Sequence, residues 1–188
     1  MPVTSKFVAL RNYIPTGLPK ETDFEIRKKE ISLDDNNNIL VLNLWISVDP
    51  YMRARMTERK NYKPPFNIGE EMEGYALGIV KESKDKNFKE GDVVFSNFGM
   101  RDYFVCKSND LKKIEPINVP MQTYLGPLGM TGHTAYTGLF KHGDLKPGQT
   151  ILVSSAGGSV GSTVCQIAKN MGCKVIASTG SDLSLIHI

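Results

Sequence analysis

The chain has 188 residues, of which 40% are hydrophobic and 23% charged, and this ordinary globular composition excludes wholesale disorder. Its net charge of +3 comes from 23 basic and 20 acidic residues that are interleaved along the chain, so no nucleic-acid partner is expected. The three cysteines contain no C-x-x-C pair, which favours a reducing compartment and disfavours a structural zinc site. Without a signal peptide or an apolar span, we expect a soluble cytoplasmic protein with no membrane partner.

Residues 6–121 hold short β-type runs separated by turn residues, which predicts a compact, partly closed β domain. The expected strands are Phe7–Leu10, Ile39–Ile46, Tyr75–Val80, Val93–Phe95 and Tyr103–Cys106. The expected turns and loops between them are Asp34–Asn38, Lys63–Pro65 and Glu90–Asp92. Trp45, within the second of these strands, is expected in the core.

From Tyr124 the pattern changes to that of an α/β protein. The expected elements are a helix over Thr131–Lys141, strands over Thr150–Ser154 and Lys174–Ser178, and between these strands a helix through Val164, Ile167, Ala168 and Met171. Gly143 and Gly172 supply C-terminal stops for the two helices. The two strands show no polar alternation, which is typical of parallel strands that are covered on both faces. Together they form one βαβ unit.

A glycine-rich loop, Ser155–Gly161, lies directly between the first of these strands and its helix, as a variant of the G-x-G-x-x-G motif requires. Ala156 is small enough for the tight turn, Gly158 lets a pyrophosphate approach the backbone, and Gly161 lets the helix pack on the sheet. The amides at the helix N-terminus attract phosphate charge. The predicted dinucleotide-binding residues are therefore Ala156, Gly157, Gly158, Ser159, Val160 and Gly161. A tight structural turn without a ligand is the alternative.

The end of the second strand distinguishes between the two nicotinamide cofactors. NAD sites usually place Asp or Glu about 20 residues beyond the motif, where it holds the ribose 2′-hydroxyl. Here that point is occupied by Ala177–Gly180, and Asp182 comes later. Ser178 offers a small hydroxyl side chain that leaves room for a 2′-phosphate. The sequence therefore predicts NADPH rather than NADH.

Four further stretches have a specific order and spacing: Ser47–Arg53 (SVDPYMR), Gly74–Val80, Phe88–Val94 and Leu125–Tyr136 (LGPLGMTGHTAY). Together with the glycine loop, they resemble the medium-chain dehydrogenase/reductase superfamily, in its zinc-free branch of prostaglandin (leukotriene) reductases and 2-alkenal reductases. The resemblance implies an α/β fold with a β-barrel. Residues 1–121 would be a GroES-like catalytic and substrate domain, and residues 122–188 a linker helix and the first βαβ unit of an NADP-binding Rossmann domain.

The resemblance also implies a reaction, the NADPH-dependent reduction of the carbon–carbon double bond of α,β-unsaturated aldehydes and ketones, and a homodimer. Negative charge builds on the carbonyl oxygen in this reaction, and Tyr51 is the predicted catalytic donor of a hydrogen bond to it. Packing between the domains is the alternative role of Tyr51. Met130 and Thr134 are placed beside the nicotinamide or its ribose, with ordinary helix packing as the alternative.

No catalytic metal is expected. Zinc-dependent members of the superfamily place a Cys ligand near the position of Asp49 and a Gly-His-Glu stretch near Gly69. Here Val48–Pro50 and Gly69–Glu71 occupy these places, so the thiolate and imidazole ligands are missing.

The last residues depart from the family. Its members continue after Asp182 with a charged helix that carries a Lys near the 2′-phosphate, whereas this sequence reads Leu183–Ile188 and stops. Because a Rossmann fold needs two βαβαβ halves, we expect the sequence to be truncated and the 188-residue chain alone to be inactive. Two other functions stay open, a zinc-free NADPH quinone reductase and a non-catalytic nucleotide-binding protein that kept the fold.

Overall fold

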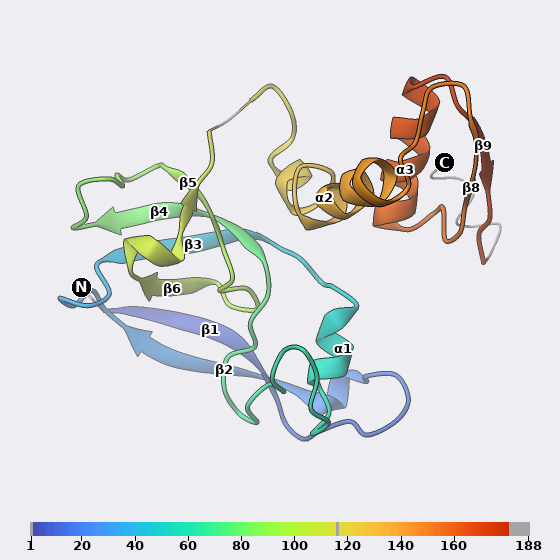
Figure 1. Ribbon diagram of the computed structural model, residues 1–188. Helices are drawn as coiled ribbons and strands as arrows, with labels where there is room; N and C mark the ends of the chain where they lie inside the picture. Colours follow the sequence, from blue (N-terminus) through green and yellow to red (C-terminus); the bar gives the residue numbers. More distant parts are fainter. Residues whose placement is uncertain (1, 116, 181–188) are drawn as a thin grey trace. The chain divides into compact units, whose positions relative to one another are not determined.

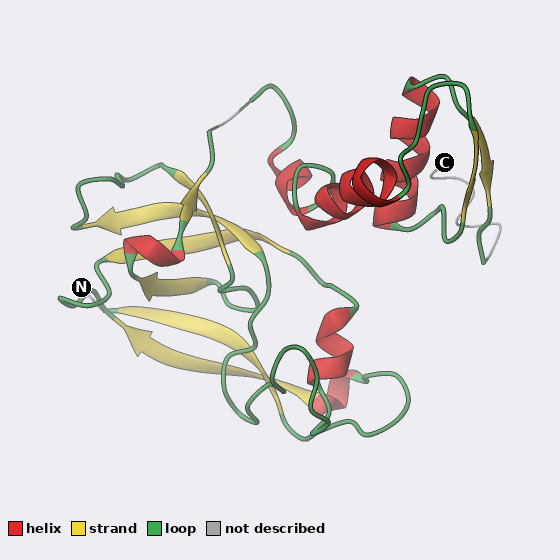
Figure 2. Cartoon of the chain, in the orientation of Figure 1, coloured by secondary structure: helices red, strands yellow, loops and turns green. Residues whose placement is uncertain are grey.

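The computed structural model describes residues 2–115 and 117–180 (Figure 1). Asp182 and the segment Leu183–Ile188, on which the predicted departure from the family depends, lie outside these residues. The chain divides into two compact units, Met1–Val119 and Pro120–Ile188. Strands dominate the first unit, whereas the second combines helices with a two-stranded sheet (Figure 2).

The first unit begins with an antiparallel hairpin of β1 (Val3–Leu10) and β2 (Phe24–Ile31), which are joined through the 3-10 helix η1 (Glu21–Asp23). β1 contains the predicted strand Phe7–Leu10. β2 is not expected from the sequence, because four charged side chains follow one another over residues 27–30. These residues are exposed, and among the described strands β2 pairs only with β1. The charges therefore lie along a sheet edge, where they oppose pairing with another chain.

A five-stranded antiparallel sheet in the order β6-β3-β4-β5-β7 forms the rest of this unit. Its strands are β3 (Ile39–Ile46), β4 (Ala76–Ser83), β5 (Val93–Ser96), β6 (Tyr103–Cys106) and the short β7 (Lys112–Lys113), which follows the 3-10 helix η2 (Ser108–Asp110). The four longer strands confirm the sequence prediction, with β4 running three residues beyond the predicted end. Their shared core consists of Ile39, Val41, Val80, Val94, Phe104 and Cys106.

The hairpin is joined to the larger sheet along β6. The Asp102 amide donates to the Lys6 carbonyl at 3.0 Å, and the buried Ser5 hydroxyl donates to the Tyr103 carbonyl at 2.6 Å. These bonds bring the two sheets together along one side, which gives the partly closed β domain that the sequence predicts.

A short helix, α1 (Tyr51–Arg55), follows β3 and covers a second core cluster. This cluster consists of Leu10, Ile14, Met52, Met56, Phe66 and Met72. The expectation that Trp45 lies in a core is wrong, because 44% of its surface is exposed. β3 pairs with β6 only as far as Leu42, and its register to β4 shifts between Asn43 and Trp45, so the end of β3 extends past the covered part of the sheet.

The second unit begins with the 3-10 helix η3 (Met121–Leu125) and α2 (Met130–Tyr136), which continues into the π-helical turn η4 (Thr137–His142). β8 (Thr150–Val153), α3 (Ser159–Asn170) and β9 (Lys174–Ala177) then form the predicted βαβ unit, with parallel strands in the register Ile151 to Val175. The predicted helix stops are confirmed, since η4 ends before Gly143 and Gly172 has a φ of 74°.

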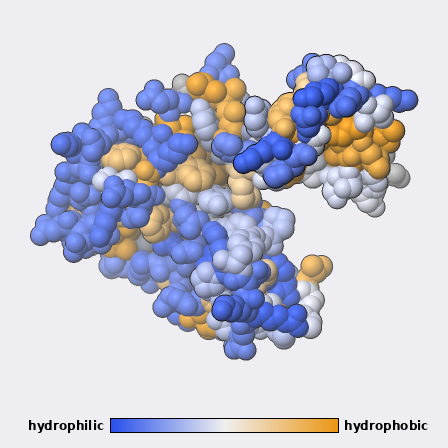
Figure 3. All heavy atoms as spheres, viewed as in Figure 1, coloured by the Kyte–Doolittle hydropathy of each residue, from blue (hydrophilic) through white to orange (hydrophobic). Residues whose placement is uncertain are grey.

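Both faces of the β8–β9 pair are apolar, as predicted, but the described residues cover only one of them. Ile151 and Val175 pack on the α3 side against a core that includes Ala168. On the opposite face Leu152 and Ile176 are 71% and 49% exposed, and hydrophobic atoms gather at the surface over these strands (Figure 3).

Candidate active site

Tyr51 begins α1 in the first unit, and the residues before it set its position. Pro50 has a φ of −55° and a ψ of −32°, already helical, and the Met52 amide donates to the Asp49 carbonyl at 3.0 Å. The half-buried Tyr51 ring meets the Tyr75 ring edge to face, with centroids 6.3 Å apart and planes at 61°. Sequence reasoning identified Tyr51 through the D-P-Y-M-R motif, and the local geometry fixes where its phenol lies.

The Tyr51 hydroxyl is inaccessible to solvent and has no hydrogen-bond partner among the described residues. One carboxylate oxygen of Asp49 is likewise buried and has no hydrogen-bond partner among the described residues. Leaving such a group unpaired costs about 1–3 kcal/mol, so a ligand oxygen that accepts from the phenol gains that energy back. Because the hydroxyl has no exposed surface here, a ligand reaches it only after Tyr51 or a neighbouring side chain rotates.

The environment keeps this phenol protonated. Burial raises the pKa of Tyr51 to about 12, and the negative charge of Asp49 adds to the effect. A neutral phenol is a hydrogen-bond donor, whereas a phenolate is only an acceptor. At neutral pH the Tyr51 side chain is therefore in the form that can stabilise negative charge on a carbonyl oxygen.

Two neighbours of Tyr51 were not among the predicted site residues. Tyr75 precedes β4, and its ring stacks on Phe95 of β5 with centroids 5.4 Å apart. Lys63 was predicted only as part of a turn, but its ammonium lies 5.0 Å from the Tyr51 ring centroid and 5.7 Å from that of Tyr75. The three side chains come from separate segments, so nothing in their sequence spacing could have revealed the cluster.

The glycine loop of the second unit has the close packing that its motif requires. A Cβ on Gly161 would lie within 2.8 Å of the Ala156 Cα and well inside contact distance of the Ser155 carbonyl oxygen. Ala156 is fully buried, and its amide donates to the Ser178 carbonyl at 3.0 Å, which ties the loop to the end of β9. Any side chain at position 161 would push α3 away from this turn.

The start of α3 presents free hydrogen-bond donors. Gly158 caps the helix in an extended conformation, and the first amide bonded to it is that of Ser162, at 2.8 Å from the Gly158 carbonyl. In the described part of the chain the amides of Ser159, Val160 and Gly161 have no acceptor. Such an array, at the positive end of a twelve-residue helix, fits the charge and hydrogen-bonding capacity of a pyrophosphate.

Of the other predicted cofactor residues, Met130 and Thr134 belong to α2, which contacts the loop, and Ser178 follows β9. The Ser159 hydroxyl donates to the Thr131 hydroxyl at 3.0 Å, which joins the loop to α2. Met130, 43% exposed, is the first residue of α2, and the exposed Thr134 donates to the Met130 carbonyl at 2.9 Å. Ser178 is exposed directly after β9, and no carboxylate occurs in Ala177–Gly180. The loop and the start of α2 are thus brought together, which spacing along the chain does not show.

Neither the expected zinc-ligand positions nor any other part of the described chain forms a metal cluster. Glu70 is exposed and accepts a hydrogen bond from Asn67 at 2.6 Å, and no three described His, Cys, Asp or Glu side chains are grouped to hold an ion. Among these residues no helix has the length and apolar character needed to cross a membrane.

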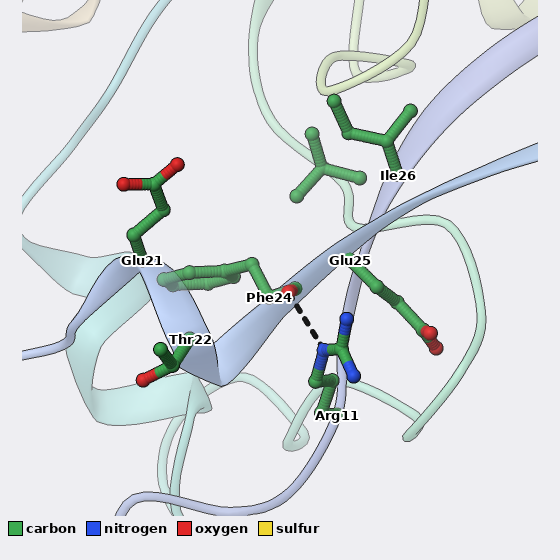
Figure 4. A pocket seen from close by; sticks show the side chains of 7 residues that line it. Arg11, Glu21, Thr22, Phe24, Glu25 and Ile26 are labelled. Carbon is green, nitrogen blue, oxygen red and sulfur yellow. Dashed lines mark hydrogen bonds between the residues drawn. The ribbon is translucent and has the colours of Figure 1, made fainter.

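A hollow of about 770 Å³ opens in the first unit beside the hairpin and η1 (Figure 4). It is lined by Val8, Arg11, Glu21, Thr22, Phe24, Glu25 and Ile26. The Arg11 side chain is held at its edge by a 2.9 Å bond from Nε to the Phe24 carbonyl. None of the predicted site residues lines this hollow, so it takes no part in the candidate active site.

Comparison with known proteins shows what the chain is similar to. A family model described as the N-terminal domain of oxidoreductase matches residues 6–114. The chain is 42% identical over 184 residues to the NADP(+)-dependent 2-alkenal reductase of Nicotiana tabacum, and 38% identical over 175 residues to prostaglandin reductase 1 of Rattus norvegicus. These alignments cover 95% and 92% of this chain but 53% and 51% of the relatives, so the chain spans about half the length of the curated relatives it matches.

A solved structure gives the same result for the fold. The crystal structure of CurA in complex with NADPH from Vibrio vulnificus superimposes with a TM-score of 0.84 at 33% identity, covering 95% of this chain and 52% of that one. The predicted fold class, a GroES-like domain followed by the start of a Rossmann domain, is confirmed. The chain belongs to the medium-chain dehydrogenase/reductase superfamily, in its zinc-free branch of prostaglandin and 2-alkenal reductases.

Proposed function

We propose that the chain carries the carbonyl-polarising and phosphate-binding parts of an NADPH-dependent reductase of α,β-unsaturated aldehydes and ketones. The single observation that carries this proposal is the buried hydroxyl of Tyr51, which has no hydrogen-bond partner among the described residues, in a chain of this family. The raised pKa of Tyr51 keeps this hydroxyl a donor. The roles of residues 1–121 as substrate domain and 122–188 as cofactor domain are part of the proposal. So are a homodimer and a cytoplasmic location, as the family implies.

Tyr51 has a defined part in this reaction. As the β-carbon of the substrate is reduced, electron density moves to the carbonyl oxygen, and the Tyr51 hydroxyl donates a hydrogen bond to that oxygen. The donor stabilises the charge most when it is already held in place and shielded from water. The buried position beside the Tyr75 ring shields the hydroxyl from water, and the backbone turn at Asp49 and Pro50 fixes the start of the helix that carries it. The Tyr51 ring itself would form an apolar wall for the enone.

The second unit would hold NADPH, which supplies the hydride when it is bound. The amides of Ser159, Val160 and Gly161 would donate to the pyrophosphate, with Gly157 and Gly158 allowing close approach of the backbone. Ser178 would lie beside the 2′-phosphate. A carboxylate in its place would repel that phosphate. Met130 and Thr134 would lie at the nicotinamide or its ribose. The NADP(H) named for two of the relatives supports this choice of cofactor.

The test is NADPH oxidation by the full-length protein with a neutral enone and, separately, with a quinone. We expect the enone to be consumed and the saturated ketone to be the product. Reduction of the quinone alone would support the second function considered from the sequence. Binding of NADPH without turnover of either compound would support a non-catalytic nucleotide-binding protein.

A further inference from the structure

In the described part of the chain, the Lys63 ammonium lies against the rings of both Tyr51 and Tyr75, and the proposed reaction gives it no role. Its side chain is half-buried, and within the described residues no carboxylate lies at ion-pair distance from it. An ammonium over two aromatic faces gains about 0.5–2 kcal/mol from them but keeps donors that the rings cannot satisfy. These donors remain able to bind an anion.

The segment that carries Lys63 is fixed at its base by Arg55. The Arg55 side chain is 6% exposed; its Nε donates to the Pro64 carbonyl at 2.8 Å, and its guanidinium lies 4.1 Å from the Phe66 ring centroid. The Phe66 amide donates back to the Arg55 carbonyl at 2.8 Å, which closes the loop. Lys63 directly precedes the anchored Pro64, so the backbone that carries its side chain is fixed next to α1.

The other charges around Tyr51 leave Lys63 as the site for an anion. Glu73 is already paired with Arg55 at 2.9 Å, so these two charges offset each other. Asp49 acts on Tyr51, whose pKa it raises, but it lies beyond ion-pair distance of Lys63. A ligand anion is thus attracted to the Lys63 end of the cluster and repelled from the Asp49 end.

We propose that Lys63 is a specificity-determining residue that selects α,β-unsaturated ketones bearing a carboxylate on the arm next to the carbonyl. The carbonyl oxygen accepts from Tyr51 while the carboxylate binds the Lys63 ammonium, and the rings of Tyr51 and Tyr75 pack against the chain between them. This inference rests on the proposed function, since it uses the same site and assigns its substrate class. No chemical step passes through Lys63.

The experiment compares two substrates and four proteins. The substrates are a straight-chain enone that carries a carboxylate two methylenes from its carbonyl, and the methyl ester of the same compound. The proteins are the full-length wild type, Lys63→Met, which keeps the apolar stem without the charge, Lys63→Arg, which keeps the charge, and Lys60→Met as a control at an exposed lysine of the same segment. Steady-state NADPH oxidation gives kcat and KM for each protein with each substrate. Isothermal titration gives the affinity of each protein for each substrate without turnover.

We expect the wild type to have a KM for the acid about fivefold below that for the ester, as for a partly buried ion pair, and this ratio to fall with added salt. Lys63→Met should make the KM for the acid equal to that for the ester, while the KM for the ester stays unchanged. Lys63→Arg and Lys60→Met should both keep the lower KM for the acid. A purely structural Lys63 would alter both substrates alike.

Equal KM values for acid and ester in the wild type, with the ester turned over, would overturn the assignment of Lys63 and leave the proposed function standing. Failure to reduce either compound would instead refute the proposed function. In that case the titration decides about Lys63 alone: tighter binding of the acid that Lys63→Met abolishes supports it, and equal binding overturns it.

Discussion

At the scale of single residues, the hydroxyl of Tyr51 is the group on which the proposed chemistry depends most. Tyr51→Phe deletes one oxygen atom that has no partner among the described residues, so the folded state loses no hydrogen bond. We expect unchanged or slightly higher stability, and a turnover number for the enone that falls by about 10²-fold, as for the loss of one oxyanion donor. Tyr136→Phe, at an exposed tyrosine, is the matched control. If Tyr51→Phe turns over at the wild-type rate, Tyr51 is a packing residue.

The raised pKa of Tyr51 gives a second, independent prediction. An ordinary tyrosine ionises near pH 10, whereas burial keeps this phenol neutral until about pH 12. Because the pKa of Tyr51 is higher in the folded state, its protonated form contributes to the free energy of unfolding below pH 10. This contribution is lost as the pH rises toward 12. Ultraviolet titration of tyrosinate in the wild type minus Tyr51→Phe should show this ionisation only above pH 11, with circular dichroism confirming that the fold is intact. A difference titration centred near pH 10 would contradict the buried phenol.

The catalytic candidate could be predicted from the sequence, but its surroundings could not. The D-P-Y-M-R motif identifies Tyr51 because the residues that position it are its immediate neighbours in the chain. Tyr75 and Lys63 reach it from other segments, and their packing depends on the sheet register and on the loop that Arg55 anchors. Such contacts between distant segments leave no periodic pattern in the sequence.

At the scale of elements, the turn from β8 into α3 depends on the absence of a side chain at Gly161. A Cβ there meets backbone atoms of Ser155 and Ala156, which cannot move aside as a flexible side chain can. We expect Gly161→Ala to destabilise the second unit by about 1–3 kcal/mol and to weaken NADPH binding. Gly138→Ala is the control, since a Cβ at Gly138 meets open space within η4.

Urea unfolding followed by hydrogen exchange measures this difference unit by unit. The first unit should be unaffected by either variant, because Gly161 and Gly138 both lie beyond Val119. Equal stability of the two variants would show that the loop tolerates a side chain, and the tight-turn interpretation of the motif would fail.

Helices and strands were predicted correctly where their own residues are enough to determine their structure. The β8–α3–β9 unit follows from two apolar runs and a glycine loop between them, and the structure confirms it. β2 was missed because its charged residues form a strand only by pairing with β1 at an edge. Trp45 was misplaced for a related reason, since its exposure depends on where the pairing of β3 with β6 ends. The formation of β2 and the exposure of Trp45 both depend on strand pairing between segments that are distant in sequence.

At the scale of the whole molecule, the proposed choice of cofactor follows from the end of β9. No carboxylate occurs between Ala177 and Gly180 to hold a ribose 2′-hydroxyl, and the exposed Ser178 leaves room for a phosphate. We expect the full-length protein to bind NADPH at least tenfold more tightly than NADH. Ser178→Asp should narrow or reverse this preference, because a carboxylate repels the 2′-phosphate. Fluorescence titration with the two cofactors measures it, and comparable affinities in the wild type would refute the argument.

The central claim is that hydride is delivered to the β-carbon of an enone, and isotope transfer tests it most directly. The full-length protein is supplied with NADPH deuterated at the transferable position and a neutral enone, and the product is analysed by nuclear magnetic resonance. The account predicts a saturated ketone with deuterium on the β-carbon and an unlabelled carbonyl carbon. Deuterium on the carbonyl carbon, giving an allylic alcohol, or no deuterium in any product, would contradict it.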